Sequence, residues 1–301
     1  MAGDSTRHII QSLLANVAIA VAKGVAAVFT GSGAMLAETL HSFADCGNQL
    51  LLLVGVKRSR KPPDATHPLG YGRVLYFWSF MVALLLFSGG GVFSIYEGIH
   101  KIQHPEEVSQ VWLGLLILGF SLVVEGWATI GNIRELDRRR GDTSFFRYLR
   151  LTKDSDLVVI FGENSAAVLG LALAMAALGM AYMTGDGRWD GVGSLAIGAV
   201  LVGVAIFLAV EVASLLVGES ADPAIEKAIH DLLPAHPSIE KVLAMLAVQQ
   251  GPNEVMIAMK VKIKPDLDAN QVCEVINQFE QALQEHQPDV RWCFVEPDLT
   301  D

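Results

Sequence analysis

Six long apolar segments constrain the fold of this chain more than any other feature of its sequence. Each has about 20 residues or more, the length that an α-helix needs to cross a bilayer. The chain has 301 residues, of which 52% are hydrophobic, and its mean hydropathy of +0.41 is too high for an ordinary soluble protein. We therefore expect a membrane α-helical fold with six transmembrane helices, at residues 8–29, 32–56, 74–98, 111–133, 156–183 and 193–217.

The loops between these segments differ in charge. Residues 57–73 carry five Lys and Arg side chains and residues 134–153 carry seven, whereas the three opposite loops carry only Lys101 and Arg188. Loops rich in Lys and Arg stay on the cytoplasmic side of a membrane. We therefore expect an integral membrane protein of the bacterial inner membrane, with its N- and C-termini in the cytoplasm.

The residues after the sixth segment have the pattern of a soluble domain. We expect a transmembrane domain at 1–217 and a cytoplasmic C-terminal α+β domain at 218–301. This domain has 15 acidic and 6 basic residues, which argues against nucleic acid as a partner. Hydrophobic periodicity predicts an α-β-β-α-β order, with a helix at 222–233, strands at 242–248 and 255–263, a helix at 268–284 and a strand at 290–295.

The second apolar segment carries polar side chains that are costly inside a bilayer. His41 and Asp45 are four residues apart and Asn48 follows three later, so all three lie on one helix face. An imidazole and a carboxylate at this spacing can bind a divalent transition metal. Ionisable residues at this depth usually mark a functional site. The alternative is that they only form hydrogen bonds between helices.

The fifth segment carries the polar pair Glu163 and Asn164 in its apolar core. Glu163 and Asp45 lie at similar depths from the same end of their helices, so the two helices could bring these carboxylates together. Either Glu163 or Asn164 could be the metal ligand, and packing between helices is the alternative. The donors of the combined set suit Zn²⁺, and also Mn²⁺, Fe²⁺, Co²⁺ or Ni²⁺. Because such ligands must lose protons to bind a metal, exchange of metal for protons is a natural mechanism.

Other polar residues have weaker patterns. Asp64 and His67, in the loop at 57–73, could form an accessory metal site, although a solvated turn is the simpler interpretation. Lys23 could neutralise a carboxylate in the membrane, and Glu125 could serve either proton transfer or packing. The chain has only three cysteines and lacks both His-Glu-x-x-His and a phosphate-binding loop, so we expect neither a disulfide framework nor an enzyme.

Two motifs resemble those of the cation diffusion facilitator family. They are Ala-Glu-Thr-Leu-His-Ser-Phe-Ala-Asp at 37–45 and His-Pro-Leu-Gly-Tyr-Gly-Arg at 67–73. The resemblance extends over nearly the whole chain. It implies six transmembrane helices, a cytoplasmic metallochaperone-like domain, a homodimer, and export of a divalent metal in exchange for protons.

The fifth segment departs from the family pattern. The family usually carries His-x-x-x-Asp or Asp-x-x-x-Asp there, whereas Val159 stands four residues before Glu163 and Ile160 four before Asn164. One ligand of the usual four is therefore missing. The Glu163-Asn164 pair and the Glu-Gly-Trp at 125–127 are similar to the branch of the family that contains zinc transporter nine.

Together these patterns predict a secondary transporter that exports a divalent metal from the cytoplasm in exchange for protons. Zn²⁺ is the metal that they favour. The partners of the transporter are the metal ions, protons, membrane lipid and a second copy of the chain, and we expect no prosthetic group. The missing ligand motivates an alternative, a transport-inactive membrane metal sensor or scaffold that signals through the C-terminal domain.

Overall fold

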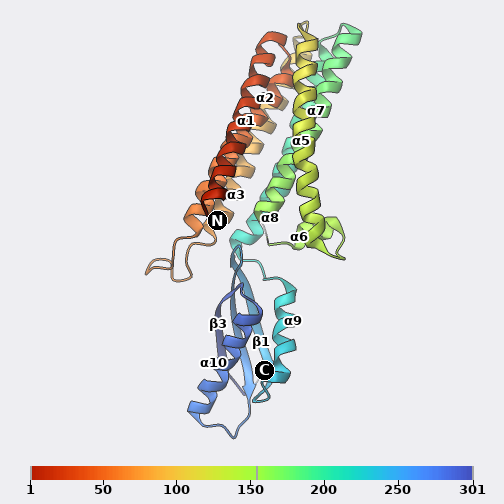
Figure 1. Cartoon of the computed structure of the whole chain (residues 1–301). Coiled ribbons are helices and arrows are strands. Elements are labelled where there is room, and N and C mark those ends of the chain that lie inside the picture. Colours follow the sequence, from red (N-terminus) through yellow and green to blue (C-terminus); the bar gives the residue numbers. More distant parts are fainter. Residues whose placement is uncertain (1, 154, 300–301) are drawn as a thin grey trace. The chain divides into compact units, whose positions relative to one another are not determined.

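The computed structural model describes residues 2–153 and 155–299 and divides the chain into two compact units. The first unit is built of long helices (Figure 1) and comprises Met1–Gly55, Trp78–Leu149 and Asp156–Val212. The second comprises Val56–Phe77, Arg150–Ser155 and Ala213–Asp301.

A helix lies at each of the six predicted segments. The third segment is a composite of two α-helices with a π-helical stretch between them, and the other five are single helices. The elements are α1 (Ala2–Thr30), α2 (Gly33–Ser59), α3 (Val74–Leu85), η1 (Leu86–Val92), α4 (Phe93–Gln103), α5 (Val111–Arg140), α7 (Ser155–Thr184) and α8 (Arg188–Val217).

Four of these segments are long and apolar enough to span a membrane, judged by length and composition over the described residues. They are Val74–Gln103, Val111–Arg140, Leu157–Thr184 and Arg188–Val217. In α1 the residues whose side chains the structure describes supply a shorter apolar stretch, Asn16–Thr30. In α2, Glu38, His41 and Asp45 interrupt the apolar run. The membrane helical fold is confirmed, and the count of six spanning helices is confirmed for four.

Glycines allow the third segment to pack directly against α8. A Cβ on Gly91 would lie 3.2 Å from the amide nitrogen of Val202, and one on Gly98 would lie 2.7 Å from that of Leu195. From the other side, a Cβ on Gly198 would lie 2.9 Å from the carbonyl oxygen of Gly91. The two backbones therefore touch with no layer of side chains between them, the packing that small residues permit in membrane helices.

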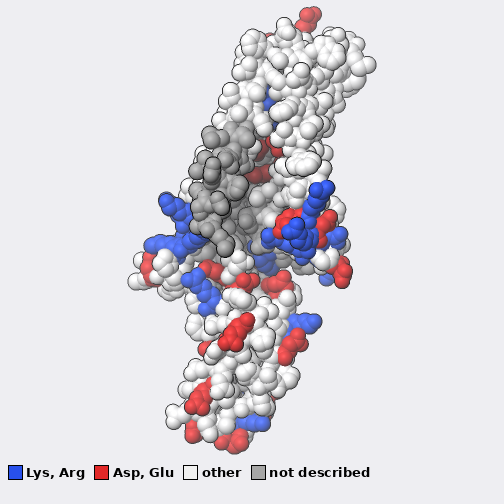
Figure 2. Space-filling view, in the orientation of Figure 1, with Lys and Arg blue, Asp and Glu red and all other residues white. Residues whose placement is uncertain are grey.

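The basic segment 134–153 is more helical than the loop that the sequence suggested. Helix α5 continues to Arg140, and a short helix, α6 (Phe145–Leu151), follows. The extension is supported by ion pairs one turn apart, since Glu135 contacts Arg139 at 2.8 Å and Asp137 contacts Arg140 at 2.7 Å. Figure 2 shows Lys and Arg gathered toward one end of the long helices, while most of the other helical surface that it draws as described is white and uncharged.

The C-terminal part of the second unit is a three-stranded sheet with helices. Its elements are α9 (Pro223–Leu232), η2 (Leu233–Ala235), β1 (Ile239–Gly251), β2 (Glu254–Ile263), α10 (Ala269–His286) and β3 (Val290–Pro297). The strand order is β1-β2-β3, with β1 and β2 antiparallel and β2 and β3 parallel. Asn253, with φ of 55°, makes the tight turn between β1 and β2. The predicted α-β-β-α-β order is confirmed.

The apolar core of this α+β part predicts that it folds without metal. Phe279 and Leu283 of α10 are fully buried against Ile257 and Val261 of β2. We expect the isolated segment 219–301 to give the same circular dichroism melting curve in EDTA and in Zn²⁺. Phe279→Ala should lower its free energy of unfolding by about 3–5 kcal/mol. A segment that is unfolded in EDTA and folds only with Zn²⁺ would contradict this.

Candidate metal centre

The site is organised by one face of α2. His41 and Asn48 are fully buried, and the Asp45 side chain is 19% exposed. One turn of helix separates His41 from Asp45, and His41 Nδ1 lies 3.6 Å from Asp45 Oδ1. The predicted imidazole–carboxylate pair therefore exists as a pair inside the helical unit.

The N-terminus of α2 is held by a carboxylate from another helix. Asp190 of α8 is fully buried and accepts hydrogen bonds from Ser32 Oγ and from the Gly33 amide, both at 2.5 Å, and from the Ala34 amide at 3.3 Å. Carboxylates suit this position because the first amides of a helix have no partners in the helix. The contact fixes where α2 begins and thereby the depth of His41 and Asp45.

Helix α7 brings the second carboxylate to the site. Asn48 Nδ2 of α2 donates a 2.6 Å hydrogen bond to Glu163 Oε1 of α7, and Glu163 is buried. The structure therefore places the predicted α2 and α7 residues side by side. Val159, one turn before Glu163, is fully buried, whereas Ile160 is 39% exposed.

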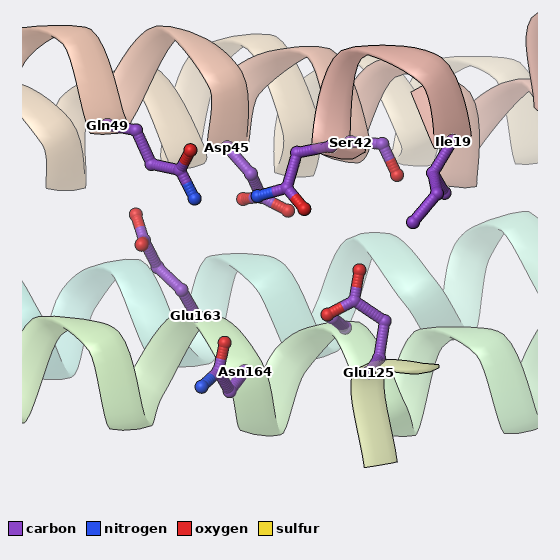
Figure 3. A pocket seen from close by; sticks show the side chains of 9 residues that line it. Ile19, Ser42, Asp45, Gln49, Glu125, Glu163 and Asn164 are labelled. Atoms are coloured by element: carbon purple, nitrogen blue, oxygen red, sulfur yellow. The ribbon is translucent and has the colours of Figure 1, made fainter. Parts of the chain in front are cut away.

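A small pocket lies between these helices. Figure 3 shows Asp45 and Gln49 pointing from α2 toward Glu163 and Asn164 on α7, with Glu125 of α5 beside them. Its cavity volume of about 40 Å³ exceeds what one water molecule needs. Asn16, Ile19, Ser42 and Ala167 complete the lining. Both candidates on α7, Glu163 and Asn164, reach this pocket, and His41 does not line it.

Several buried atoms at the site have no hydrogen-bond partner in the described part of the chain. They include both ring nitrogens of His41, Asp45 Oδ1 and Asn48 Oδ1. Buried polar atoms are rarely left unpaired in native proteins, so these atoms are available to bind an ion or water. Nitrogen and oxygen donors together suit a divalent transition metal. Among the described residues, no three His, Cys, Asp or Glu side chains converge on one point, so a bound ion would need Asn48, Asn164, Gln49 or water as further donors.

The accessory pair in the loop of the second unit is held by protein contacts. Asp64 accepts hydrogen bonds from Lys61 Nζ at 2.6 Å, Tyr71 Oη at 2.8 Å and Thr66 Oγ1 at 2.7 Å. Lys61 contributes most to holding the pKa of the Asp64 carboxyl below its ordinary value. His67 Nδ1 lies 3.8 Å from Asp64 Oδ1. A metal ion here would have to displace Lys61, and this arrangement favours the solvated turn that the sequence also allowed.

Sequence reasoning missed Glu38 and three of the polar residues that line the pocket. Asn16, Ser42 and Gln49 line it, and Glu38 makes an ion pair with Lys23 in which both side chains are fully buried. The partner of Lys23 was therefore an unconsidered carboxylate. A signal was available, because Glu38 and Ser42 precede Asp45 by seven and three residues and so lie on the same helix face.

Residues 9–217, which make up most of the chain, match the cation efflux transmembrane domain. The chain therefore belongs to the cation efflux, or cation diffusion facilitator, family of membrane transporters.

Among its relatives, the chain is 34% identical to the proton-coupled zinc antiporter SLC30A9, mitochondrial, of Xenopus laevis, over 79% of this chain and 43% of that protein. It is 32% identical to the protein of the same name in Homo sapiens, over 88% of this chain and 47% of that protein. It is 32% identical to metal tolerance protein C4 of Arabidopsis thaliana, over 64% and 43% respectively. The chain spans about half the length of these curated relatives.

Proposed function

We propose that this chain is a secondary antiporter that moves Zn²⁺ out of the compartment faced by its basic loops, in exchange for protons. The observation that carries the proposal is a set of nitrogen and oxygen atoms of His41, Asp45 and Asn48 that have no hydrogen-bond partner among the described residues and lie buried near Glu163. The zinc antiporters named among its relatives support the choice of metal and of coupling ion.

The chemistry of the metal-binding groups explains why metal movement would be coupled to proton movement. A metal ion entering the pocket would bind Asp45 and Glu163, with Asn164 or Gln49 as further donors, only after protons leave the two carboxyl groups. Protons arriving from the other side of the membrane would then compete for the same carboxylates and release the ion. The exchange therefore needs one site that opens to each side in turn, and no separate proton pathway.

Orientation and assembly form part of the same proposal. The basic ends of the helices, among them Lys57 and Arg58 in the last turn of α2, would lie in the cytoplasm. Both termini would then lie on the side from which metal is loaded. The membrane is the bacterial inner membrane in this proposal, and the working unit is a homodimer.

The test is metal uptake by the purified protein in lipid vesicles. With a pH gradient imposed, we expect Zn²⁺ accumulation that collapses when the gradient is dissipated, and a panel of Mn²⁺, Fe²⁺, Co²⁺ and Ni²⁺ should define the selectivity. Zn²⁺ binding without any gradient-dependent uptake would instead favour a transport-inactive sensor or scaffold.

A substitution on α7 should narrow the selectivity. Val159→His would place an imidazole one turn from Glu163 on the same helix face, rebuilding the His-x-x-x-acid pair that the chain lacks. Two nitrogens and two carboxylates favour tetrahedral Zn²⁺ over metals that prefer octahedral oxygen sites. We expect a higher ratio of Zn²⁺ to Mn²⁺ uptake in vesicles that contain both metals.

The neighbouring position provides the control. Ile160→His puts the same imidazole on a partly exposed position, so it should leave the ratio unchanged. A Zn²⁺ preference gained by Ile160→His but not by Val159→His would mean that Asn164, and not Glu163, is the ligand on α7.

A further inference from the structure

A buried ion pair lies about one helix turn beyond the pocket, toward the N-terminus of α2. Lys23 of α1 and Glu38 of α2 are both fully buried, and Lys23 Nζ lies 3.3 Å from Glu38 Oε2. The same ammonium group donates a 2.8 Å hydrogen bond to Ser42 Oγ. Ser42 lines the pocket and Glu38 does not, so the pocket ends at Ser42 on this side. Lys23, Ser42 and Glu38 together close the site toward the N-terminus of α2.

The second carboxylate oxygen of Glu38 lies against a glycine of α7. Glu38 Oε1 is buried and has no hydrogen-bond partner among the described residues. It occupies the space of a missing side chain on α7, because a Cβ on Gly170 would overlap it. Gly170 lies seven residues after Glu163, which is two turns along the same face of α7. The unpartnered oxygen therefore lies in the same α2–α7 interface as the metal site.

Glu38 and Asp45 on α2 are seven residues apart, the same spacing as that of Glu163 and Gly170 on α7. Glu38 precedes Asp45 by seven residues, or about 10 Å along the helix. Carboxylates thus occur twice along the α2–α7 interface, first at Asp45 with Glu163 and then at Glu38, whose Oε1 fills the space beside Gly170. A divalent ion that moves from the basic ends of the helices through the pocket would meet Glu38 next.

We infer that Glu38 is a relay ligand on the release path of the transported metal, and that Lys23 is a tethered cation that occupies this carboxylate when the path is empty. The ion leaving Asp45 and Glu163 binds Glu38 while the ammonium group of Lys23 withdraws from it, and the return of Lys23 closes the path. This inference rests on the proposed metal transport and assigns the exit side of the same site.

A purely structural ion pair between α1 and α2 is the competing explanation, and a paired substitution separates the two. Glu38→Gln alone leaves a buried ammonium group without its carboxylate, which is destabilising. The double variant Lys23→Met/Glu38→Gln removes both charges and should remain folded. If the pair is only structural, this variant transports like the wild type. If Glu38 is a relay ligand, the variant stays slow.

The measurement is pH-driven Zn²⁺ uptake in vesicles with equal amounts of folded protein. For Lys23→Met/Glu38→Gln we expect a turnover at least about tenfold lower, with an unchanged KM, because loading at Asp45 and Glu163 is intact. Glu107→Gln, at an exposed position, is the control and should match the wild type. Wild-type turnover in the double variant, or a raised KM with unchanged turnover, would overturn the inference.

A second pair of variants tests the place of the oxygen without changing charge. Gly170→Ala should slow turnover, because its methyl group takes the space of Glu38 Oε1. Shortening the acid by Glu38→Asp in the same protein should restore much of the rate, and equal rates for Gly170→Ala and the wild type would count against the relay. Failure of the wild type itself to take up Zn²⁺ would instead refute the proposed transport function.

Discussion

Asp45→Ala is expected to reduce pH-driven Zn²⁺ uptake to the level of empty vesicles. Asp45 supplies a carboxylate to the pocket, and its Oδ1 has no hydrogen-bond partner among the described residues. The substitution therefore removes a proposed ligand from the proposed metal site, while it breaks little that holds the helices together. The variant should insert and purify like the wild type, with a melting temperature within a few degrees.

The matched control is Asp142→Ala, which removes the same side chain from an exposed position between α5 and α6. It should leave uptake unchanged. If a folded Asp45→Ala protein transported Zn²⁺ at the wild-type rate, the assignment of the site to the face of α2 would be wrong.

Asp190→Ala should strongly lower the stability of the helical unit. The substitution leaves the Ser32 hydroxyl and the Gly33 and Ala34 amides buried with no acceptor, and each lost partner costs about 1–3 kcal/mol. A total loss of about 3 kcal/mol or more is expected. Thermal denaturation in detergent should show it as a much lower melting temperature.

Asp190→Asn separates this anchoring role from a loss of packing. It keeps one acceptor oxygen and the shape of the side chain, so its melting temperature should lie between those of the wild type and Asp190→Ala. A melting temperature for Asp190→Ala equal to that of the wild type would show that α2 needs no anchor at its N-terminus.

Most of the fold follows from periodicity. The lengths of the apolar segments predicted the central parts of all six long helices. The alternation of apolar and polar residues predicted the two strands on either side of the turn at Asn253. The ends were less predictable. Side-chain ion pairs carry α5 on to Arg140, and a hydrogen bond of 2.9 Å from the Arg188 amide to Asp186 starts α8 earlier than the apolar run does. Such contacts leave little trace in hydropathy.

The site was predictable within one helix and much less so between helices. The spacing of His41, Asp45 and Asn48 is a local property, and the structure has them on one face of α2 as expected. The partners of buried charges depend on packing between distant segments. Lys23 and Glu38 come from different helices, and Asp190 reaches a helix that begins more than 150 residues before it. No pattern within a single segment predicts which residues of two helices will pair.

The direct backbone contact between α8 and the segment that includes α4 limits which parts of a carrier can move. At Gly91, Gly98 and Gly198 the two backbones are in direct contact, so there is no room for a side chain to move between them. These two segments should therefore travel as one rigid body. The rearrangement that exposes the metal first to one side and then to the other must then occur elsewhere, where side chains separate the helices. The α2–α7 interface, with its pocket and its buried charges, is such a place, so the hinge and the binding site would be the same structure.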